Sequence, residues 1–151
     1  MKPLRNLDVP IADATQGLAR SVMENDLAQV KQEEILTAHP DEPVLDVIER
    51  MKQANRGCVL VLDGDNLAGI FTKREVLRKV AGERVQEAAK VPVSELMTPK
   101  PETLRETDSV ATAFNRMALG RYTHVPVEKT DGTYTVIAAD DLLKYIAQED
   151  W

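Results

Sequence analysis

The apolar positions of the chain change their spacing twice between residues 44 and 81, and each change indicates a new element. Four residues at the start have the i, i+3, i+4, i+7 spacing of an amphipathic helix: Val44, Val47, Ile48 and Met51. Two β-rich runs follow at residues 58–62 and 67–71, separated by turn residues at 63–66, which predicts a hairpin. A second helix is then expected, with three apolar residues on one face: Val76, Leu77 and Val80.

The same order of elements recurs later in the chain, where residues 110–147 align with residues 44–81 without a gap. We call the displacement that carries Val44 onto Val110 the repeat shift. The identical pairs are Val44/Val110, Arg50/Arg116, Met51/Met117, Val59/Val125, Val61/Val127, Asp65/Asp131, Leu77/Leu143 and Ala81/Ala147. The second copy carries its helix triplet at Leu142, Leu143 and Ile146. With a short first strand expected near Ile35–Ala38 and near Thr103–Arg105, each repeat has the order β-α-β-β-α, which places the chain in the mixed α/β (α+β) class.

Neither repeat is expected to be self-sufficient, because about 55 residues with few aromatic side chains bury only a marginal core. We therefore expect the two repeats to pack as a pseudo-two-fold pair. The predicted division is an N-terminal helical extension at 1–29, a first repeat at 30–90 and a second repeat at 91–151. The helical candidate Asp13–Glu34 is only loosely periodic and has no counterpart in the second repeat. It is expected to pack on the pair or on a partner.

Composition limits the classes of function. Of 151 residues 43% are apolar and 29% charged, which is typical of a globular domain. The formal net charge of −6 argues against nucleic acid as a partner, because such affinity comes largely from neutralising phosphates. Residues 1–25 lack the apolar run of a signal peptide, and no run approaches the roughly 20 apolar residues of a membrane span, so we expect a cytoplasmic protein without membrane contact.

The residues that usually carry metal or catalytic chemistry are scarce. Cys58 is the single cysteine and lies inside an apolar run, so it is predicted to be a small core residue without a disulfide. His39 and His124 are too far apart in sequence for a local metal motif. No nucleophile, metal cluster or acid–base pair emerges, and the sequence predicts neither a metal site nor an enzyme.

Three stretches resemble a known family. Residues Gly57–Leu77 look like the first half of a tandem cystathionine-β-synthase-type (CBS) domain pair, also called a Bateman module. Val93–Thr98 resembles the beginning of the second half, and Arg121–Val127 resembles its strand with a proline near the end. The resemblance implies a regulatory protein without catalysis that binds AMP, ADP, ATP or S-adenosylmethionine in clefts between the repeats. It also implies a homodimer, no obligatory cofactor and a protein partner that the sequence leaves unknown.

The family signature is Gly-hydrophobic-x-Thr/Ser-x-x-Asp, in which the hydroxyl touches phosphate and the carboxylate holds the ribose. The first repeat matches it with Gly69 and Thr72 but has Glu75 in place of aspartate. The second repeat keeps Asp141 but has Thr135 for the glycine and Ala138 for the hydroxyl. A hydroxyl and free N–H groups at a helix start bind anions, and a nearby carboxylate accepts two hydrogen bonds from vicinal hydroxyls, so the residue types fit this role independently.

The remaining candidates surround these positions. Ile35 and Leu36 would cradle the base, and Lys73 and Arg74 lie near enough to the helix start to hold a phosphate. His124 matches a position from which a basic residue reaches phosphate in the family, and Arg121 lies close by. The full predicted ligand-binding set is Ile35, Leu36, Thr72, Lys73, Arg74, Glu75, Arg121, His124 and Asp141.

Each candidate also has a structural interpretation. Thr72 and Glu75 have the spacing of a capping box at a helix start, and one residue can serve both roles. Asp141 is expected to be a ribose contact or a partner of the helix dipole rather than a member of such a box. His124 could be a packed strand residue, and the charges near Lys73 could form a solvated face. The two functions left open are an adenine-nucleotide sensor that signals to a partner and a ligand-free dimerisation module with degenerate sites.

Overall fold

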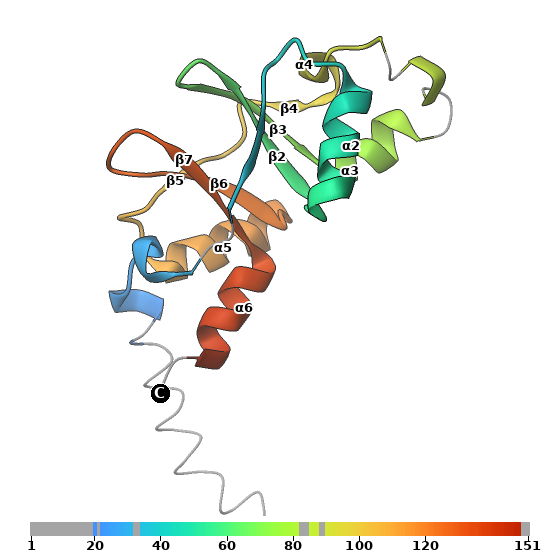
Figure 1. The fold of residues 1–151 in the computed structure, drawn as a ribbon. Helices are drawn as coiled ribbons and strands as arrows, with labels where there is room; N and C mark the ends of the chain where they lie inside the picture. The colour runs from blue at the N-terminus through green and yellow to red at the C-terminus, as the bar shows by residue number, and fades with distance from the viewer. Residues whose placement is uncertain (1–19, 21, 32–33, 82–84, 88–89, 149–151) are drawn as a thin grey trace, which may run out of the picture. The chain divides into compact units, whose positions relative to one another are not determined.

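The computed structural model describes residues 20, 22–31, 34–81, 85–87 and 90–148 (Figure 1). The chain folds into two units that are not contiguous in sequence. We call residues 33–103 with 131–135 the first-repeat unit, and residues 1–32, 104–130 and 136–151 the second-repeat unit. Most of the predicted N-terminal extension lies outside the described residues. The predicted boundaries at residues 30 and 91 remain a prediction.

The first-repeat unit begins with the predicted β-α-β-β-α order. Its elements are β1 (Leu36–Ala38), α2 (Val44–Ala54), β2 (Cys58–Asp63), β3 (Asn66–Thr72) and α3 (Lys73–Glu75), which continues as the π-helical turn η2 (Val76–Val80). Then follow η3 (Val85–Glu87), α4 (Val93–Leu96) and β4 (Thr98–Pro99). The sheet has the order β1-β2-β3-β4, with β1 parallel to β2 and the other neighbours antiparallel. Figure 1 shows α2 and α3 side by side.

The second repeat has the same order of elements, which lie in the second-repeat unit except for the first two residues of β7, Tyr134 and Thr135. These are β5 (Leu104–Arg105), α5 (Val110–Gly120), β6 (His124–Glu128), β7 (Tyr134–Ala138) and α6 (Ala139–Gln148), in a sheet of order β5-β6-β7. The parallel registers are equivalent, because Ala38 pairs with Val61 and their counterparts under the repeat shift, Leu104 and Val127, pair with each other. The repeated β-α-β-β-α architecture and the mixed α+β class are therefore confirmed.

Each unit has its own aliphatic core. In the first-repeat unit the fully enclosed side chains include Val44, Val47, Val61, Phe71 and Val93. In the second-repeat unit they include Leu27, Val110, Val127, Ile137 and Leu142. Both cores thus contain residues from outside the predicted repeat to which the core belongs: Val93 and Leu96 in the first, Leu27 and Val30 in the second.

Two short segments at the starts of the predicted repeats, 25–30 and 91–96, each make hydrogen bonds to the other repeat, and we call these the lead-in segments. The N–H of Val110 donates to the carbonyl of Asn25 at 2.9 Å, and the N–H of Val44 donates to Val91 at 2.9 Å. These bonds satisfy the first N–H of α5 and of α2, which has no partner inside its own helix. Residues 25–30 therefore cap the second repeat, and residues 91–96 cap the first.

The return hydrogen bonds are equivalent as well. Leu27 N–H donates to Asp108 at 2.9 Å and Ala28 N–H to Glu106 at 3.1 Å. In the other unit Val93 N–H donates to Glu42 at 2.8 Å and Ser94 N–H to Pro40 at 3.1 Å. The repeat shift relates every donor and acceptor of one set to its counterpart in the other. The prediction that the segment before the first repeat has no counterpart is wrong for residues 25–30, because their backbone hydrogen bonds match those of residues 91–96, and both segments bury apolar residues at equivalent positions.

Two apolar positions of the predicted second helices do not face a core. Leu77 on η2 is 73% exposed and Leu143 on α6 is 60% exposed, whereas Val80 and Leu142 are buried. The helical spacing groups these residues within one broad apolar stripe, but the sheet covers only part of that stripe. Leu77 and Leu143 therefore lie on the exposed part of the predicted apolar faces.

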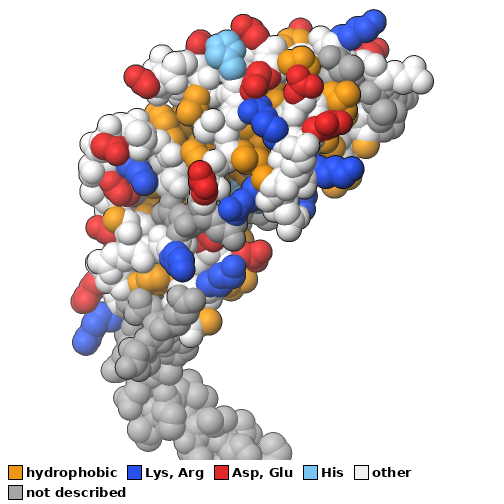
Figure 2. All heavy atoms as spheres, viewed as in Figure 1, with side chains coloured by type: hydrophobic (Ala, Val, Ile, Leu, Met, Phe, Trp, Pro, Cys, Tyr) orange, Lys and Arg blue, Asp and Glu red, His pale blue; other side chains and the backbone are white. Residues whose placement is uncertain are grey.

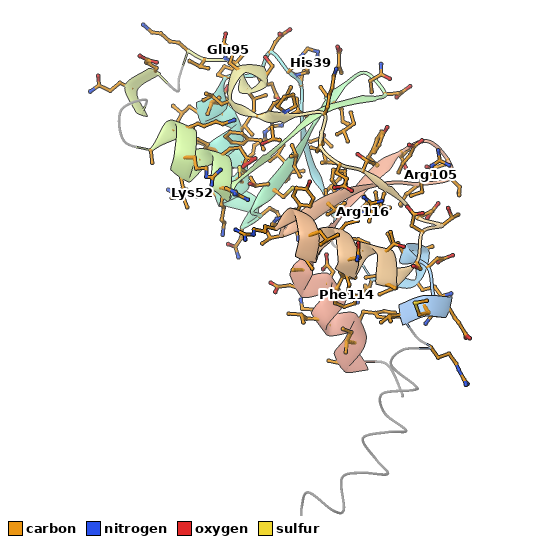
Figure 3. The ribbon with its side chains drawn as sticks, turned by 180° about the vertical axis from the view of Figure 1, so that it is seen from behind. His39, Lys52, Glu95, Arg105, Phe114 and Arg116 are labelled. Atoms are coloured by element: carbon orange, nitrogen blue, oxygen red, sulfur yellow. The ribbon has the colours of Figure 1, made fainter. Side chains whose placement is uncertain are left out.

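A carboxylate holds the turn between the first strand and first helix of each repeat. Glu42 Oε2 accepts from the His39 N–H at 2.8 Å, and Asp108 Oδ2 accepts from the Arg105 N–H at 2.8 Å. Glu42 also pairs with Arg50 at 2.6 Å. Burial raises the pKa of Glu42, but the His39 N–H and the Arg50 guanidinium outweigh it and hold that pKa below its usual 4.5. Figure 3 shows Arg116, the equivalent of Arg50, on α5.

The exchange of lead-in segments predicts which unit a distant substitution weakens. Leu27 is fully buried in the second-repeat core, so Leu27→Ala should cost about 2–5 kcal/mol of stability there. Hydrogen exchange should show lost protection in α5, β6 and α6 and unchanged protection in α2, β2 and β3. The matched variant Leu96→Ala in α4 should give the reverse pattern. Loss of protection in α2 and β2 on Leu27→Ala would contradict the exchange.

The Glu42 contacts predict a pH-dependent contribution to stability. A carboxylate whose pKa is lowered in the folded state stabilises it above its unfolded pKa, and this contribution is lost as the pH falls through the folded pKa. Glu42→Gln should therefore lower the free energy of unfolding at pH 7 by up to about 1 kcal/mol, because the pair is partly exposed. Urea titrations should show the deficit closing below pH 4. The exposed neighbour variant Glu49→Gln serves as the control, and a deficit that persists at pH 3 would refute the assignment.

Candidate functional site

The predicted ligand residues divide between the two units, and each unit holds one half-site. The first-repeat half-site contains Ile35, Leu36 and residues 72–75, and the second-repeat half-site contains Arg121, His124 and Asp141. In each unit the half-site lies where the last strand of the hairpin passes into the second helix. The same hydrogen bond shapes both junctions: Lys73 N–H donates to the Gly57 carbonyl at 3.1 Å, and Ala139 N–H donates to the Thr123 carbonyl at 2.9 Å.

Thr72 ends β3 and begins the helix of the first-repeat half-site. Its backbone is extended, and its hydroxyl accepts a hydrogen bond from the Arg74 N–H at 3.2 Å. This is the N-cap geometry that stabilises a helix start. The structure thus bears out the capping role of Thr72 that the spacing allowed.

Glu75 is a buried carboxylate, 6% exposed, whose two oxygens are both occupied. One accepts from the Thr72 hydroxyl and the other from the Thr98 hydroxyl on β4, the latter at 2.9 Å. In a capping box this carboxylate would accept from the backbone N–H of the cap residue. Glu75 instead bonds to the cap hydroxyl and ties the helix start to β4.

Cys58 lies beside this carboxylate at the start of β2, in register with Thr72. Burial, together with the negative charge of Glu75, raises the pKa of the Cys58 thiol to about 12. The thiol therefore stays protonated and weakly nucleophilic at neutral pH. This agrees with the predicted role of Cys58 as a packing residue.

Close packing requires a residue without a side chain at Gly69, the glycine of the family signature. A Cβ built on Gly69 would lie 2.3 Å from Met97 Sδ and 2.8 Å from the Thr98 carbonyl oxygen. The glycine therefore lets the chain at Met97 and Thr98 approach β3, where Gly69 pairs with Pro99 and Ile70 with Thr98. Without this approach the Thr98 hydroxyl would not reach Glu75.

The cations and apolar residues of the first-repeat half-site flank these groups. Lys73 and Arg74 are exposed, and the Lys73 side chain covers Gly57, whose built Cβ would lie 3.3 Å from Lys73 Cε. Leu36 pairs with Val59, so Ile35 and Leu36 lie at the same end of the sheet as Cys58 and Thr72. Two strand spacings separate β1 from β3, which is roughly 10 Å.

Asp141 lies in the first turn of α6 and is half-buried. Its Oδ2 accepts from the N–H of Ala138, the residue before the helix, at 2.8 Å. This bond is the backward half of a capping box, in which an acidic residue in the first turn holds the cap residue's N–H. The expectation that Asp141 stands outside a box is wrong, because the backward bond needs only a backbone N–H at position 138 and no hydroxyl there.

The basic candidates of the second-repeat half-site lie at the end of α5 and the start of β6. Arg121 is exposed and closes α5 in the left-handed conformation, with φ of 57°. His124 begins β6, is half-buried, and its Nδ1 lies 3.0 Å from the Thr123 hydroxyl. Because Ala139 bonds to Thr123 and Ala138 bonds to Asp141, the histidine strand and the aspartate helix meet at this junction.

Sequence reasoning missed Thr98 as a member of the first-repeat half-site. Thr98 belongs to the stretch that resembles the start of the second repeat, yet its hydroxyl serves the first. The one signal in the sequence was its position directly after Met97 in that stretch. The partner, Glu75, is 23 residues earlier, and only the strand pairing of β3 with β4 brings the two together.

The sequence belongs to a known family. A profile of the CBS domain matches residues 20–82 and 93–148, and the chain is therefore a member of the CBS domain family with the domain present twice. The first match includes the lead-in segment 25–30. Among the residues that the structure describes, no helix is long and apolar enough to cross a membrane.

A curated relative is the CBS domain-containing protein CBSCBSPB1 of Arabidopsis thaliana, 29% identical over 109 residues that cover 72% of this chain and 20% of that protein. The chain spans between 17% and 20% of the length of this and three similar Arabidopsis proteins.

Two solved structures illustrate the likeness of the fold. A putative signal-transduction protein with CBS domains from Burkholderia ambifaria MC40-6 is 32% identical, with a TM-score of 0.67 over 78% of this chain and 87% of that one. CBSX2 of Arabidopsis thaliana, solved in complex with AMP, has a TM-score of 0.71 at 17% identity over 82% of this chain and 97% of that one.

The environment of Cys58 predicts slow chemical modification. With a pKa near 12, the thiolate fraction at pH 8 is on the order of 10³-fold below that of an ordinary thiol. Iodoacetamide should label the folded protein at least about 100-fold more slowly than the protein in guanidinium chloride. The folded rate should still rise with pH above pH 9, where the unfolded rate levels off. Equal folded and unfolded rates at pH 8 would contradict the raised pKa.

Proposed function

We propose that this CBS pair is a regulatory module that binds an adenine nucleotide and passes its bound state to a protein partner. The observation that carries the proposal is the Asp141 carboxylate, half-buried at the start of α6 and held through Oδ2 by the Ala138 N–H. It combines the acceptor chemistry needed for a ribose with a fixed orientation and partial access to solvent. AMP bound to CBSX2, which shares the fold, supports the choice of ligand.

A fixed carboxylate suits a vicinal diol. The Ala138 bond orients the side chain, and among the described residues no donor occupies Oδ1. Oδ1 and the second lone pair of Oδ2 are able to accept hydrogen bonds from the 2′ and 3′ hydroxyls of a ribose. The carboxylate also interacts favourably with the positive end of the helix dipole.

Phosphate recognition falls to local cations. His124 and Arg121 lie in the same unit as Asp141, while Lys73 and Arg74 are exposed beside the Thr72 cap in the first-repeat unit. On the face drawn in Figure 2, lysine and arginine side chains are interspersed with carboxylates rather than gathered in one basic surface. Such a distribution fits a small phosphate better than a nucleic acid backbone.

The first-repeat half-site is less suited than the second to hold a ribose. Glu75 would have to give up the Thr98 hydroxyl before it could hold a ribose, and a buried carboxylate that loses a partner is costly. Ile35, Leu36, Thr72, Lys73 and Arg74 remain as apolar and phosphate contacts. We therefore assign the ribose to Asp141 in preference to Glu75.

Signalling requires that the nucleotide prefer one arrangement of the protein. A ligand shifts a conformational equilibrium only by its difference in affinity for the two states. A nucleotide held at the Asp141 junction would therefore favour whichever state of the protein binds it more tightly. A homodimer through the CBS pair and an additional protein partner would then read that state.

A second function is favoured by one observation. Both oxygens of Glu75 are engaged by Thr72 and Thr98, so the first-repeat half-site is satisfied without a ligand. With Thr135 and Ala138 in the signature positions of the second repeat, the chain could serve as a ligand-free dimerisation module. This alternative predicts that no nucleotide changes the stability or the assembly of the protein.

Nucleotide binding is tested by thermal unfolding with AMP, ADP, ATP and S-adenosylmethionine at millimolar concentration. A ligand at about 100 times its dissociation constant should add roughly 2.7 kcal/mol of stability. Asp141→Asn keeps an acceptor for the Ala138 N–H but removes the charge, so it should reduce the shift while leaving the unliganded stability nearly unchanged. Asp140→Asn, on the exposed face of the same turn, is the matched control.

Three results decide between the functions. A shift that Asp141→Asn reduces and Asp140→Asn preserves supports the proposed site. A shift that survives Asp141→Asn but disappears with Glu75→Gln would move the ribose to the first-repeat half-site. No shift with any of the four ligands would refute nucleotide binding and favour the dimerisation module.

A further inference from the structure

The carboxylate of Glu75 already holds two hydroxyl groups, one on each oxygen. Oε2 accepts from the Thr72 hydroxyl, and Oε1 accepts from the Thr98 hydroxyl at 2.9 Å. A vicinal diol, such as the 2′ and 3′ hydroxyls of a ribose, would make the same two bonds to an ionised carboxylate, which accepts through both oxygens. Two threonines of the chain therefore give Glu75 the donors that a ribose would give.

The two threonines are held in place by different parts of the structure. Thr72 is fixed at the helix start, since its hydroxyl also accepts from the Arg74 N–H at 3.2 Å. Thr98 is exposed and belongs to β4, a strand of 2 residues at the edge of its sheet. Short edge segments with few hydrogen bonds open locally more readily than the core of a fold. Of the two donors, Thr98 is therefore the one that a ligand is able to displace.

The second repeat lacks this arrangement. Under the repeat shift Thr72 corresponds to Ala138, which has no hydroxyl, and Glu75 corresponds to Asp141. Asp141 Oδ2 accepts from the Ala138 N–H at 2.8 Å, and among the residues that the structure describes no hydroxyl donates to this carboxylate. The chain thus carries one carboxylate that its own hydroxyls occupy and one that they do not.

We propose that Thr98 is an internal competitor of the ribose at Glu75, so that the wild-type chain binds its nucleotide at Asp141 and keeps a second, latent site closed in the first-repeat unit. The inference deepens the proposed function and takes the class of ligand, an adenine ribonucleotide, from it. Withdrawal of the Thr98 hydroxyl would free Oε1 for a ribose hydroxyl. Lys73 and Arg74 are exposed beside the Thr72 cap and supply the charge for a phosphate.

Displacement of Thr98 by a ribose keeps the hydrogen bonds of Glu75 balanced. Glu75 is 6% exposed, and a buried carboxylate that loses a donor without a replacement is destabilised. A ribose hydroxyl on Oε1 replaces the Thr98 hydroxyl by a group of the same kind, and the second lone pair of Oε2 is left for the other hydroxyl. Thr98 has the advantage in the wild-type chain, because a donor on the same chain acts at an effective concentration of roughly millimolar. The site is therefore closed at lower nucleotide concentrations.

Removal of the Thr98 hydroxyl tests the competition. Thr98→Val keeps the shape of the side chain without the donor, and AMP is titrated into the wild-type and variant chains by isothermal calorimetry. We expect one AMP per chain for the wild type and two for Thr98→Val. Thr98→Ser restores a hydroxyl and should return the count to one. The matched control Thr103→Val removes a hydroxyl that donates to the Pro101 carbonyl at 3.0 Å, and it should leave the count at one.

Two further measurements locate the new site and monitor the fold. Thr98→Val combined with Glu75→Gln removes the charge of the acceptor, which should weaken the second site by about tenfold or more. The monophosphate of 2′,3′-dideoxyadenosine lacks the diol and should not fill the second site. Hydrogen exchange at Lys100 reports whether β4 stays in place in each variant, because the Lys100 N–H donates to the Ala68 carbonyl at 3.2 Å.

The outcomes separate this inference from the proposed function. Two AMP sites in Thr98→Val, with the second weakened by Glu75→Gln, support the internal competitor. No binding to the wild type but one site in Thr98→Val would refute nucleotide binding at Asp141 and would still support the competitor at Glu75.

Three results overturn the internal competitor. The first is an unchanged count in Thr98→Val while Lys100 stays protected from exchange. The second is an additional site that survives Glu75→Gln, and the third is loss of wild-type binding on Glu75→Gln alone, which would mean that Glu75 is open already. If Lys100 loses protection in Thr98→Val, the titration is repeated with Thr98→Ala, and the absence of a second site in both variants overturns the proposal as well.

Discussion

The structure depends on the backbone hydrogen bonds by which each lead-in segment caps the other repeat. Residues 25–30 satisfy the first N–H of α5, and residues 91–96 satisfy the first N–H of α2. Each segment also inserts apolar residues into the core it caps, with Leu27 in one and Val93 in the other. A buried N–H left without these partners would cost about 1–3 kcal/mol. Neither repeat is therefore complete without a piece of chain from outside it.

The same exchange explains why the two half-sites differ. The lead-in segment 91–96 continues into β4, and β4 delivers the Thr98 hydroxyl to Glu75. Gly69 is required at this point because a side chain there would collide with Met97. In the second-repeat unit Asp141 is held only by the Ala138 N–H among the described residues and stays half-buried. Glu75 and Asp141 occupy the same position of the repeat. Glu75 links the helix start to β4, whereas Asp141 is a candidate acceptor for a ribose.

Much of the fold follows from periodicity. The helical spacing at Val44 and Val110, the hairpins and the short first strands all lie where the patterns predict, because these elements bury one face against one sheet. For the candidate site, the sequence predicted which residue types stand at each helix start. Thr98 was not, since nothing in its neighbourhood in the sequence points to Glu75. The backward bond of Asp141 was also missed, because it is made to a backbone N–H and leaves no mark in the side chains.

The amino-acid sequence on its own determined the repeat, the order of elements in each half and the membership of the family, because local periodicity and the repeat shift are properties of the chain. The tertiary structure decided which repeat each lead-in segment completes. It also decided that Glu75, and not Asp141, is the carboxylate with both oxygens engaged by neighbouring hydroxyl groups. It also decided that Leu77 and Leu143 face water. These outcomes depend on backbone groups and on how much of each helix the sheet covers, and a pattern of side chains does not encode either one.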